Sequence, residues 1–149
     1  MSNKIISKIY LRDGRAPIPR SEHTSRVMSA NKGNGTKPEV SLRKALWSKG
    51  IKGYRINWKK APGRPDIAFP GKKVAVFVHG CFWHRCPLCN LSSPKSNAEF
   101  WENKFSKNLE RDIRKNEQLK NNGWTVITTW ECEIKDNLEN IVEKVKNNI

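Results

Sequence analysis

Four cysteines are the first residues in this chain whose type and spacing suggest chemistry. Cys81, Cys86 and Cys89 lie within nine residues, and Cys132 stands apart from them. Four thiolates fill the tetrahedral shell of a zinc ion and leave no open position for water. The pattern therefore predicts a structural zinc site. The alternatives are ordinary buried or surface thiols, or a site in which His84 replaces one cysteine.

A carboxylate and two histidines form a second group. Asp66 follows Gly63-Arg64-Pro65 at the start of an expected strand, His79 ends the next strand, and His84 follows shortly after. A carboxylate on a rigid strand can anchor the divalent cation that phosphodiester hydrolysis uses, and histidines transfer protons near neutral pH. A lone aspartate beside proline is usually a turn residue. The interpretation therefore depends on all three residues together.

The charge of the chain indicates a polyanionic partner. Lysine and arginine number 29 against 14 acidic residues, a formal net charge of +15. Nucleic acid and anionic membranes are the usual partners of such a surface. No apolar run reaches the roughly 18 residues that span a bilayer, and the N-terminus lacks the pattern of a secretory signal. We therefore expect a cytosolic protein that binds nucleic acid and has no membrane partner.

Periodicity and turn residues predict the elements that must position these groups. Residues 1–24 are expected to form a flexible basic arm, and residues 25–149 one domain, with a short helical stretch at 25–30. Helices are predicted from Thr36 to Gly50, from about Ser96 to Gly123, and after Asn137. Strands are predicted at 54–58, 66–69, 73–79 and 124–130.

Two helix starts have the spacing of a capping box, in which the first side chain caps the helix and an acidic residue three positions later reaches back. They are Thr36-Lys37-Pro38-Glu39 and Ser96 with Glu99. Both helices also carry an expected apolar face. These faces consist of Val40, Leu42, Leu46 and Trp47 in the first helix, and of Trp101, Phe105, Leu109 and Ile113 in the second.

The strand at 73–79, the long helix and the strand at 124–130 predict a β-α-β unit with parallel strands and a right-handed crossover. Parallel strands end at the same edge of a sheet. Cys81 lies two residues beyond His79, and Cys132 lies two residues beyond Trp130. If the strands are neighbours, the distant cysteine joins the other three.

Pro65-Asp66 before a strand pair resembles the restriction-endonuclease-like (PD-(D/E)xK) nucleases, although their usual acidic-x-Lys element is absent. Residues 77–84, FVHGCFWH, stand in its place. This segment is similar to the very-short-patch repair (Vsr) mismatch endonucleases. So are further motifs at residues 36–39, 62–66, 99–101, 108–112, 123–124 and 130–132, and the likeness runs from about Ser25 to Cys132. The resemblance implies a restriction-endonuclease-like α/β fold, with a central mixed sheet flanked by helices and a structural zinc site.

The resemblance also implies catalytic roles. Asp66 would bind catalytic magnesium with help from the main-chain carbonyl of Val78. His84 would activate or position water, and His79 would assist at the scissile phosphate. Glu39 would complete the site through metal-bound water, although a capping glutamate needs no catalytic role. Arg111 and Asp112 match the family, but we expect them to be solvated or salt-bridged.

An aromatic wedge is a further implication of the family. Phe82, Trp83 and Trp101 would enter beside a mismatch from the major groove, and Met28 from the minor groove. Wedges unstack bases, and a mispaired step resists unstacking least. Core packing is the alternative for Trp101, and an ordinary place in a short helix is the alternative for Met28.

The family implies magnesium-dependent nicking of one DNA strand on the 5′ side of the thymine of a T·G mismatch. A monomer suffices for one nick. A cytosine-5 methyltransferase and mismatch-repair proteins would be functional companions in the bacterial cytosol or nucleoid. Two departures stand out, because Cys86 occupies a place where relatives often have histidine, and Val78 one where some have threonine. The rival hypotheses are a non-catalytic zinc module that binds nucleic acid and a related nuclease that needs no mismatch.

Overall fold

The computed structural model describes residues 35–149, so the expectations for Met28, for the arm 1–24 and for a helix at 25–30 lie outside the described residues. The described elements follow the chain as α3 (Lys37–Ser48), β1 (Arg55–Ile56), β2 (Ile67–Phe69), β3 (Val74–His79), α4 (Ala98–Asn121), β4 (Thr125–Trp130), α5 (Glu131–Asp136) and α6 (Leu138–Lys146). Over this part of the chain, every helix is too short or too polar to cross a membrane.

The four strands form one mixed sheet in the order β1-β2-β3-β4. β1, β2 and β3 pair antiparallel, whereas β3 and β4 pair parallel with α4 between them in the chain. The predicted β-α-β unit is therefore confirmed. Its register pairs His79 with Trp130, so Cys81 and Cys132 leave the sheet at the same edge.

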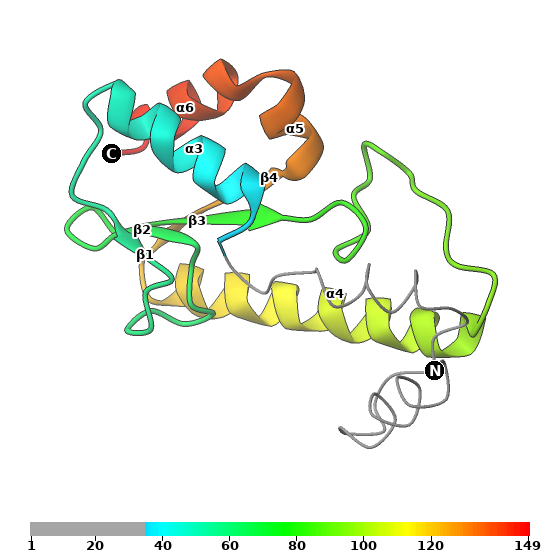
Figure 1. Cartoon of the computed structure of the whole chain (residues 1–149). Coiled ribbons are helices and arrows are strands. Elements are labelled where there is room, and N and C mark those ends of the chain that lie inside the picture. The colour runs from blue at the N-terminus through cyan, green and yellow to red at the C-terminus, as the bar shows by residue number, and fades with distance from the viewer. Residues whose placement is uncertain (1–34) are drawn as a thin grey trace, which may run out of the picture.

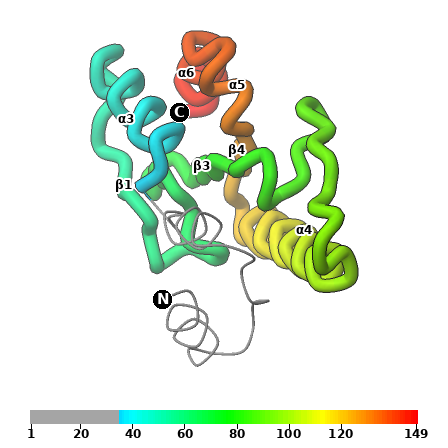
Figure 2. Tube along the Cα trace, turned by 45° about the vertical axis from the view of Figure 1, so that its right-hand side comes forward, coloured from blue at the N-terminus to red at the C-terminus, as the bar shows by residue number. Residues whose placement is uncertain are grey.

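Helices cover both faces of the sheet. α3, α5 and α6 lie on one face and the long α4 lies on the other, in both views (Figure 1 and Figure 2). Side chains alternate along a strand. Val74, Val76 and Val78 of β3 pack with the three-helix side, whereas Ala75 and Phe77 pack with Leu119 of α4. The same alternation turns His79 toward α4.

Two elements differ from the sequence prediction. The strand predicted at 54–58 shrinks to Arg55–Ile56, because Gly53 and Asn57 on either side have positive φ angles of 84° and 47° and interrupt the extended backbone. The short α5 was not predicted. It follows β4 without a glycine or proline break and buries Ile134, so no turn residue marked it.

The helix starts also depart from expectation. The capping box at Ser96 is wrong, because α4 begins at Ala98 after Asn97, whose φ of 56° is left-handed and whose side chain caps nothing. At α3 the Thr36 hydroxyl does not cap the helix and instead donates a hydrogen bond to Glu39 at 3.2 Å. Only the cap at Asn137 is confirmed, since its side chain accepts from the Asn140 amide at 3.2 Å.

The apolar face predicted for α4 holds only in its first half. Trp101 and Phe105 are buried, but Leu109 is 56% exposed and Ile113 is 49% exposed. A repeat of four residues drifts by roughly 40° per step around a helix of 3.6 residues per turn. The predicted face therefore rotates out of the interior. Trp47 of α3 is likewise exposed rather than packed.

Candidate active site and cysteine cluster

A cleft of about 600 Å³ lies at the end of β3, between the start of α3 and the middle of α4. Asp66, His79 and His84 all line it, and Glu39 and Asp112 line it with them. Sequence separation hides this proximity, because the five side chains come from α3, the start of β2, the end of β3, the following loop and α4. The fold brings the carboxylates and histidines of the sequence prediction into one place.

Asp66 enters the cleft because of the strand register. Ile67 pairs with Val76, so continuing the register places Asp66 opposite Phe77, on the face of the sheet that packs on α4. Oδ2 of Asp66 accepts a hydrogen bond of 2.7 Å from the Val78 amide. Burial raises the pKa of Asp66 from 3.8 to about 6 despite this hydrogen bond, and the charge of Glu39 adds to the rise.

The two histidines stack on each other. The ring centroids of His79 and His84 are 4.0 Å apart, and the ring planes are 8° from parallel. Trp130 packs edge-on against His79 at 5.2 Å. Burial and, to a lesser extent, the neighbouring charge of His84 lower the pKa of His79 from 6.5 to about 4. His79 is therefore neutral at physiological pH.

Asp112 was expected to be solvated or salt-bridged, and it pairs with His84 inside the cleft. Its Oδ2 lies 2.6 Å from Nδ1 of His84, and its side chain is only 14% exposed. Burial raises the pKa of Asp112, but the hydrogen bond and the charge of His84 outweigh burial, so the net pKa is lowered. An ionised Asp112 holds His84 as the donor of Nδ1–H, which leaves Nε2 available to accept a proton.

Glu39 is 4% exposed and lines the cleft. Its Oε2 accepts from the Gly35 amide at 2.8 Å, and its Oε1 accepts from the Thr36 hydroxyl. The sequence alternatives were a cap and a catalytic carboxylate. Glu39 orders the chain before α3 and also faces the cleft, so the geometry is compatible with both.

Phe82 and Trp83 follow His79 on the loop that leaves β3 and join an aromatic cluster. The Phe82 ring packs edge-on against Trp83, Trp101 and Phe105, with centroids 5.1, 5.5 and 5.4 Å apart. Trp101 and Phe105 are buried, whereas Phe82 and Trp83 are partly exposed. Trp83 also lines the cleft. The cluster therefore places two partly exposed rings on the loop that carries His84, and one of them, Trp83, lines the cleft.

Two polar contacts fix this loop on α4. The Asn108 side chain donates a hydrogen bond of 3.0 Å to the carbonyl of Trp83. The Arg85 guanidinium lies 4.4 Å from the Phe105 ring centroid and donates to the carbonyl of Leu91. Trp83 and Arg85 are therefore positioned by contacts with α4 as well as by their connection to β3.

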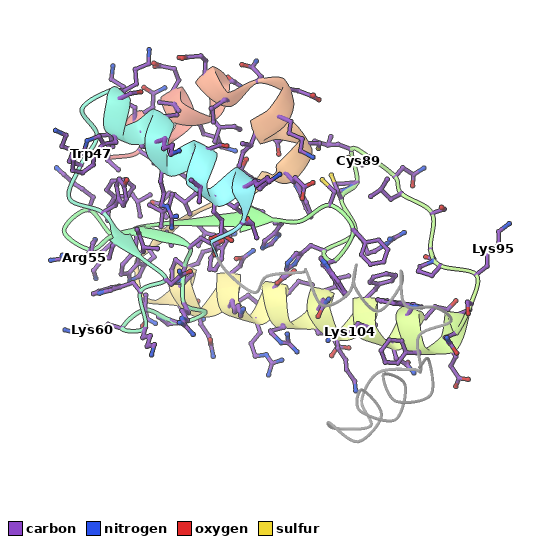
Figure 3. The ribbon with its side chains drawn as sticks, in the orientation of Figure 1. Trp47, Arg55, Lys60, Cys89, Lys95 and Lys104 are labelled. Atoms are coloured by element: carbon purple, nitrogen blue, oxygen red, sulfur yellow. The ribbon has the colours of Figure 1, made fainter. Side chains whose placement is uncertain are left out.

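The four cysteines form a second cluster beyond the sheet edge. Their Sγ atoms all lie within 4.8 Å of one another. Figure 3 shows the sulfur atoms beside Cys89, where the loop after β3 meets α5. Four sulfurs about 2.3 Å from one zinc ion stand roughly 3.8 Å apart, and Sγ of Cys86 and Sγ of Cys132 are 3.7 Å apart. The cluster can bind a metal ion, as the parallel register predicted.

The thiols of this cluster shift one another's pKa values, some upward and one downward. Burial raises the pKa of Cys81 to about 11 and also raises that of Cys132, where the other three thiols add to the rise. Burial also raises the pKa of Cys86, but main-chain amides of Cys89 and Leu88 and hydrogen bonds from Cys132 and Cys81 outweigh burial, so the net pKa is lowered. A cation among the sulfurs would favour the ionised form of every thiol.

Sequence reasoning missed Lys115 and noted Asn108 and Asp112 only within the family-like motif at 108–112, without a place in the site. A signal was present, because these positions continue the face of Trp101 and Phe105 at steps of three and four residues. The apolar pattern pointed to Leu109 and Ile113, which are exposed. Polar residues that continue a buried helical face are therefore the pattern that indicates the site.

Comparison with known proteins gives the same family throughout. The family model described as DNA mismatch endonuclease Vsr matches residues 18–90. The type II nicking enzyme V.NmeAIP of Neisseria meningitidis is 44% identical over 119 residues, covering 74% of this chain and 83% of the relative. V.NaeI of Lentzea aerocolonigenes, also a type II nicking enzyme, is 43% identical over 125 residues, covering 80% and 74%.

The DNA mismatch endonuclease Vsr of Escherichia coli is 35% identical over 111 residues, covering 74% of this chain and 70% of the relative. The names of these relatives and the carboxylates and histidines of the cleft indicate the same activity, cleavage of DNA. The chain is a DNA-nicking endonuclease that hydrolyses phosphodiester bonds, and it belongs to the Vsr family of DNA mismatch endonucleases.

Proposed function

We propose that this endonuclease nicks one strand on the 5′ side of the thymine of a T·G mismatch, by magnesium-dependent hydrolysis. The observation that carries the proposal is the placement of Phe82 and Trp83, two accessible rings, in the same loop turn as His84. A site built only for paired DNA needs no accessible rings beside its catalytic groups. The name of the E. coli relative, a mismatch endonuclease, supports the same substrate.

Asp66 is the proposed magnesium ligand, together with the carbonyl of Val78. Mg²⁺ prefers oxygen ligands. Asp66 offers a buried carboxylate whose pKa is raised to about 6 by burial, and a cation relieves that unfavourable ionisation. His79, His84 and Asp112 also lie close enough to hold a metal, but two imidazoles suit zinc better than magnesium. When bound, Mg²⁺ polarises the phosphate and favours deprotonation of the attacking water.

His84 is the proposed general base. Asp112 orients its ring, and Nε2 is then the nitrogen that accepts the proton of the attacking water. Asp112 also stabilises the imidazolium that results, because its own pKa is lowered and it stays ionised. His79 is neutral at pH 7, so its role at the scissile phosphate is hydrogen bonding. Glu39 is proposed to orient water in the cleft.

Phe82, Trp83 and Trp101 are the proposed wedge, with Met28 on the opposite groove. Trp101 is 7% exposed in the free protein. We therefore assign insertion to Phe82 and Trp83 and assign to Trp101 the support of their rings. Base unstacking costs a few kcal/mol and costs least at a mispaired step. A wedge that gains a similar amount discriminates in favour of mismatches.

Zinc is the proposed occupant of the cysteine cluster, bound by Cys81, Cys86, Cys89 and Cys132. Four protein ligands close the site, so its role is structural. The ion would tie the loop that carries Phe82 and Trp83 to α5 at the end of β4. We also infer a restriction-endonuclease-like fold, consistent with the mixed sheet covered by helices on both faces.

The remaining partners follow from the same proposal. The enzyme acts as a monomer, because a single nick needs one site. T·G mismatches arise when 5-methylcytosine deaminates, so a cytosine-5 methyltransferase and mismatch-repair proteins are its expected companions. The arm 1–24 is proposed to add sequence-independent contacts with phosphates.

The decisive experiment compares two duplexes that differ at one base. A T·G heteroduplex and its fully paired T·A control are incubated with the protein and magnesium, and the cut is mapped on both strands. We expect one nick, 5′ to the mismatched thymine, and little cutting of the control. Equal nicking of both duplexes would replace the proposal with a nuclease that needs no mismatch. Nicking without added divalent cation would contradict the proposed dependence on magnesium.

A further inference from the structure

The face that α4 turns inward changes character along its length. It begins with aromatic side chains, continues with polar ones and ends in the apolar core. Its members are Trp101, Phe105, Asn108, Asp112, Lys115 and Leu119. Asn108 donates a hydrogen bond to the carbonyl of Trp83, and Asp112 pairs with His84. Both partners lie on the catalytic loop, residues 80–86, which follows β3. Lys115, half-buried, is the next polar position and also lines the cleft.

Gly63 packs closely against the aliphatic part of the Lys115 side chain. A Cβ atom added to Gly63 would lie 2.8 Å from both Cβ and Cγ of Lys115 and 3.0 Å from its Cδ. Gly63 also has a φ of 76°, a backbone angle that residues with a side chain rarely adopt. Only glycine therefore lets the loop that leads into Asp66 pass this close to α4. The contact confines the lysine stem to the wall of the cleft.

Glu39, Asp66, Asp112 and Glu131 line the cleft, yet a phosphodiester of DNA must enter it. Arg64, Lys104 and Arg111 also line the cleft, but all three are exposed, whereas Lys115 is half-buried. Each carboxylate repels the phosphate. The charge of Lys115 acts on this group, since it opposes the effect of burial on the pKa of Asp66 and adds to the lowering of the pKa of Asp112. A lysine is a compact point charge suited to phosphate.

We propose that Lys115 is a catalytic residue whose ammonium contacts the phosphate at the cut, or the phosphate next to it, in the nicked strand. The inference rests on the proposed catalytic cleft but not on the T·G mismatch. Charge on the phosphate oxygens grows as water attacks, and a fixed cation stabilises that charge more than it stabilises the ground state. Lys115 therefore affects the rate of nicking more than the affinity for DNA.

The first test measures single-turnover rates on whichever duplex the wild-type protein nicks. Lys115→Met keeps the stem against Gly63 and removes only the charge. Losing one electrostatic contact to the transition state slows reactions about 100-fold or more, and we expect a loss of that size. Lys115→Arg should recover most of the rate. Lys107→Met, which removes an exposed charge from the same helix, should stay near wild type.

The second test needs no cleavage. Binding is measured in EDTA to duplexes that each carry one uncharged methylphosphonate near the cut. The wild-type protein should lose affinity when the contacted phosphate is neutral. Lys115→Met should be insensitive at that phosphate while it keeps its sensitivity elsewhere.

Two outcomes would overturn the assignment: equal rates for Lys115→Met and Lys107→Met, or wild-type sensitivity of Lys115→Met at every phosphate. Melting temperatures near wild type show that each variant folds, and Lys115→Arg supplies the folded comparison if Lys115→Met does not. Failure of the mismatch proposal looks different. In that case the wild-type protein nicks paired DNA as fast as T·G DNA, and the Lys115 ratios are measured on the paired duplex.

Discussion

Nδ1 of His84 lies 2.6 Å from Oδ2 of Asp112, although 28 positions separate the two residues in the chain. The contact joins the loop after β3 to the middle of α4, and both residues line the cleft. It decides which imidazole nitrogen faces the substrate, because the nitrogen that donates to Asp112 cannot also accept a proton. The proton-accepting atom of the site is thereby set by α4 rather than by the loop that carries His84.

Asp112→Asn should slow nicking by about 100-fold or more, in the range that general bases contribute. A neutral amide no longer stabilises the imidazolium of His84, and its NH₂ group can donate to Nδ1 and select the wrong tautomer. Affinity for DNA should be unchanged or slightly higher, because one negative charge is lost. Single-turnover rates and binding in EDTA measure the two effects separately.

Asp136→Asn is the matched control, since it makes the same chemical change at an exposed position on α5. Its rate should remain near wild type. If Asp112→Asn were as active as this control, His84 would not need an ionised partner and its role as base would be lost.

Asp66→Asn should abolish nicking yet stabilise the metal-free protein. Burial raises the pKa of Asp66 from 3.8 to about 6, so the ionised carboxylate weakens the fold at neutral pH. A difference of about two pKa units corresponds to roughly 2–3 kcal/mol. The carboxyl contributes its full stability below pH 4, and that contribution is lost as pH rises through 6. Denaturant unfolding at pH 8 and at pH 4 in EDTA measures the difference.

At pH 8 Asp66→Asn should be more stable than the wild-type protein, and at pH 4 the two should converge. Magnesium should stabilise the wild-type protein and not the variant, because the proposed ligand is gone. A variant that is less stable at pH 8, or that responds to magnesium like wild type, would contradict both the buried carboxylate and its assignment as ligand.

Much of the fold could be predicted from the sequence because its strong signals are local. The valine-rich β3, the glycine after α4 and the cap at Asn137 each fix an element from neighbouring residues. The β-α-β rule then fixed the parallel pairing, and with it the meeting of Cys81 and Cys132. The short extent of β1 and the existence of α5 escaped prediction, because backbone angles at Gly53 and Asn57 and the burial of Ile134 decide them.

The site was predicted less completely, for a related reason. Asp66, His79 and His84 stand on or beside strands, and their residue types suggest chemistry by themselves. Asp112 and Lys115 lie on a helix with many charged residues, where most side chains are solvated. Only the packing of α4 against the loop at Gly63 and the loop after β3 separates these two from their neighbours.

Removal of metal from the cysteine cluster should unfold the loop and lower the melting temperature sharply. Structural zinc contributes folding free energy on the order of 10 kcal/mol in small zinc-dependent peptides. We expect one zinc per chain by elemental analysis. Cys132→Ser should bind less zinc and melt at a lower temperature, because serine is a poor zinc ligand.

Ser92→Ala, an exposed change on the same loop, is the control and should retain zinc and stability. Thiol titration supplies an independent measurement, since all four cysteines should react with a thiol reagent only after a zinc chelator is added. Active protein without zinc, or four thiols that react freely in the native protein, would exclude the structural zinc.

The double change Phe82→Ala, Trp83→Ala should lower nicking of T·G duplexes by about tenfold or more, since each 1.4 kcal/mol of lost stabilisation is one decade in rate. Stacking of a base on an aromatic ring is worth roughly 1–3 kcal/mol, and the cost of unstacking is lowest at a mispaired step. Weak binding to fully paired DNA should barely change, because that binding rests on the basic surface. Nicking rates on T·G DNA and affinities for both duplexes measure the separation.

Trp47→Ala is the control for this double change, because Trp47 is 56% exposed, does not line the cleft, and lies on the far side of the molecule from Cys89 (Figure 3). Loss of an exposed ring should leave nicking and both affinities near wild type. Phe82 also packs on Phe105 at 5.4 Å, so melting temperatures must show that the double variant is folded at the assay temperature. An equal loss of affinity for both duplexes, or an unchanged T·G rate, would make the rings part of the core and leave mismatch recognition without this mechanism.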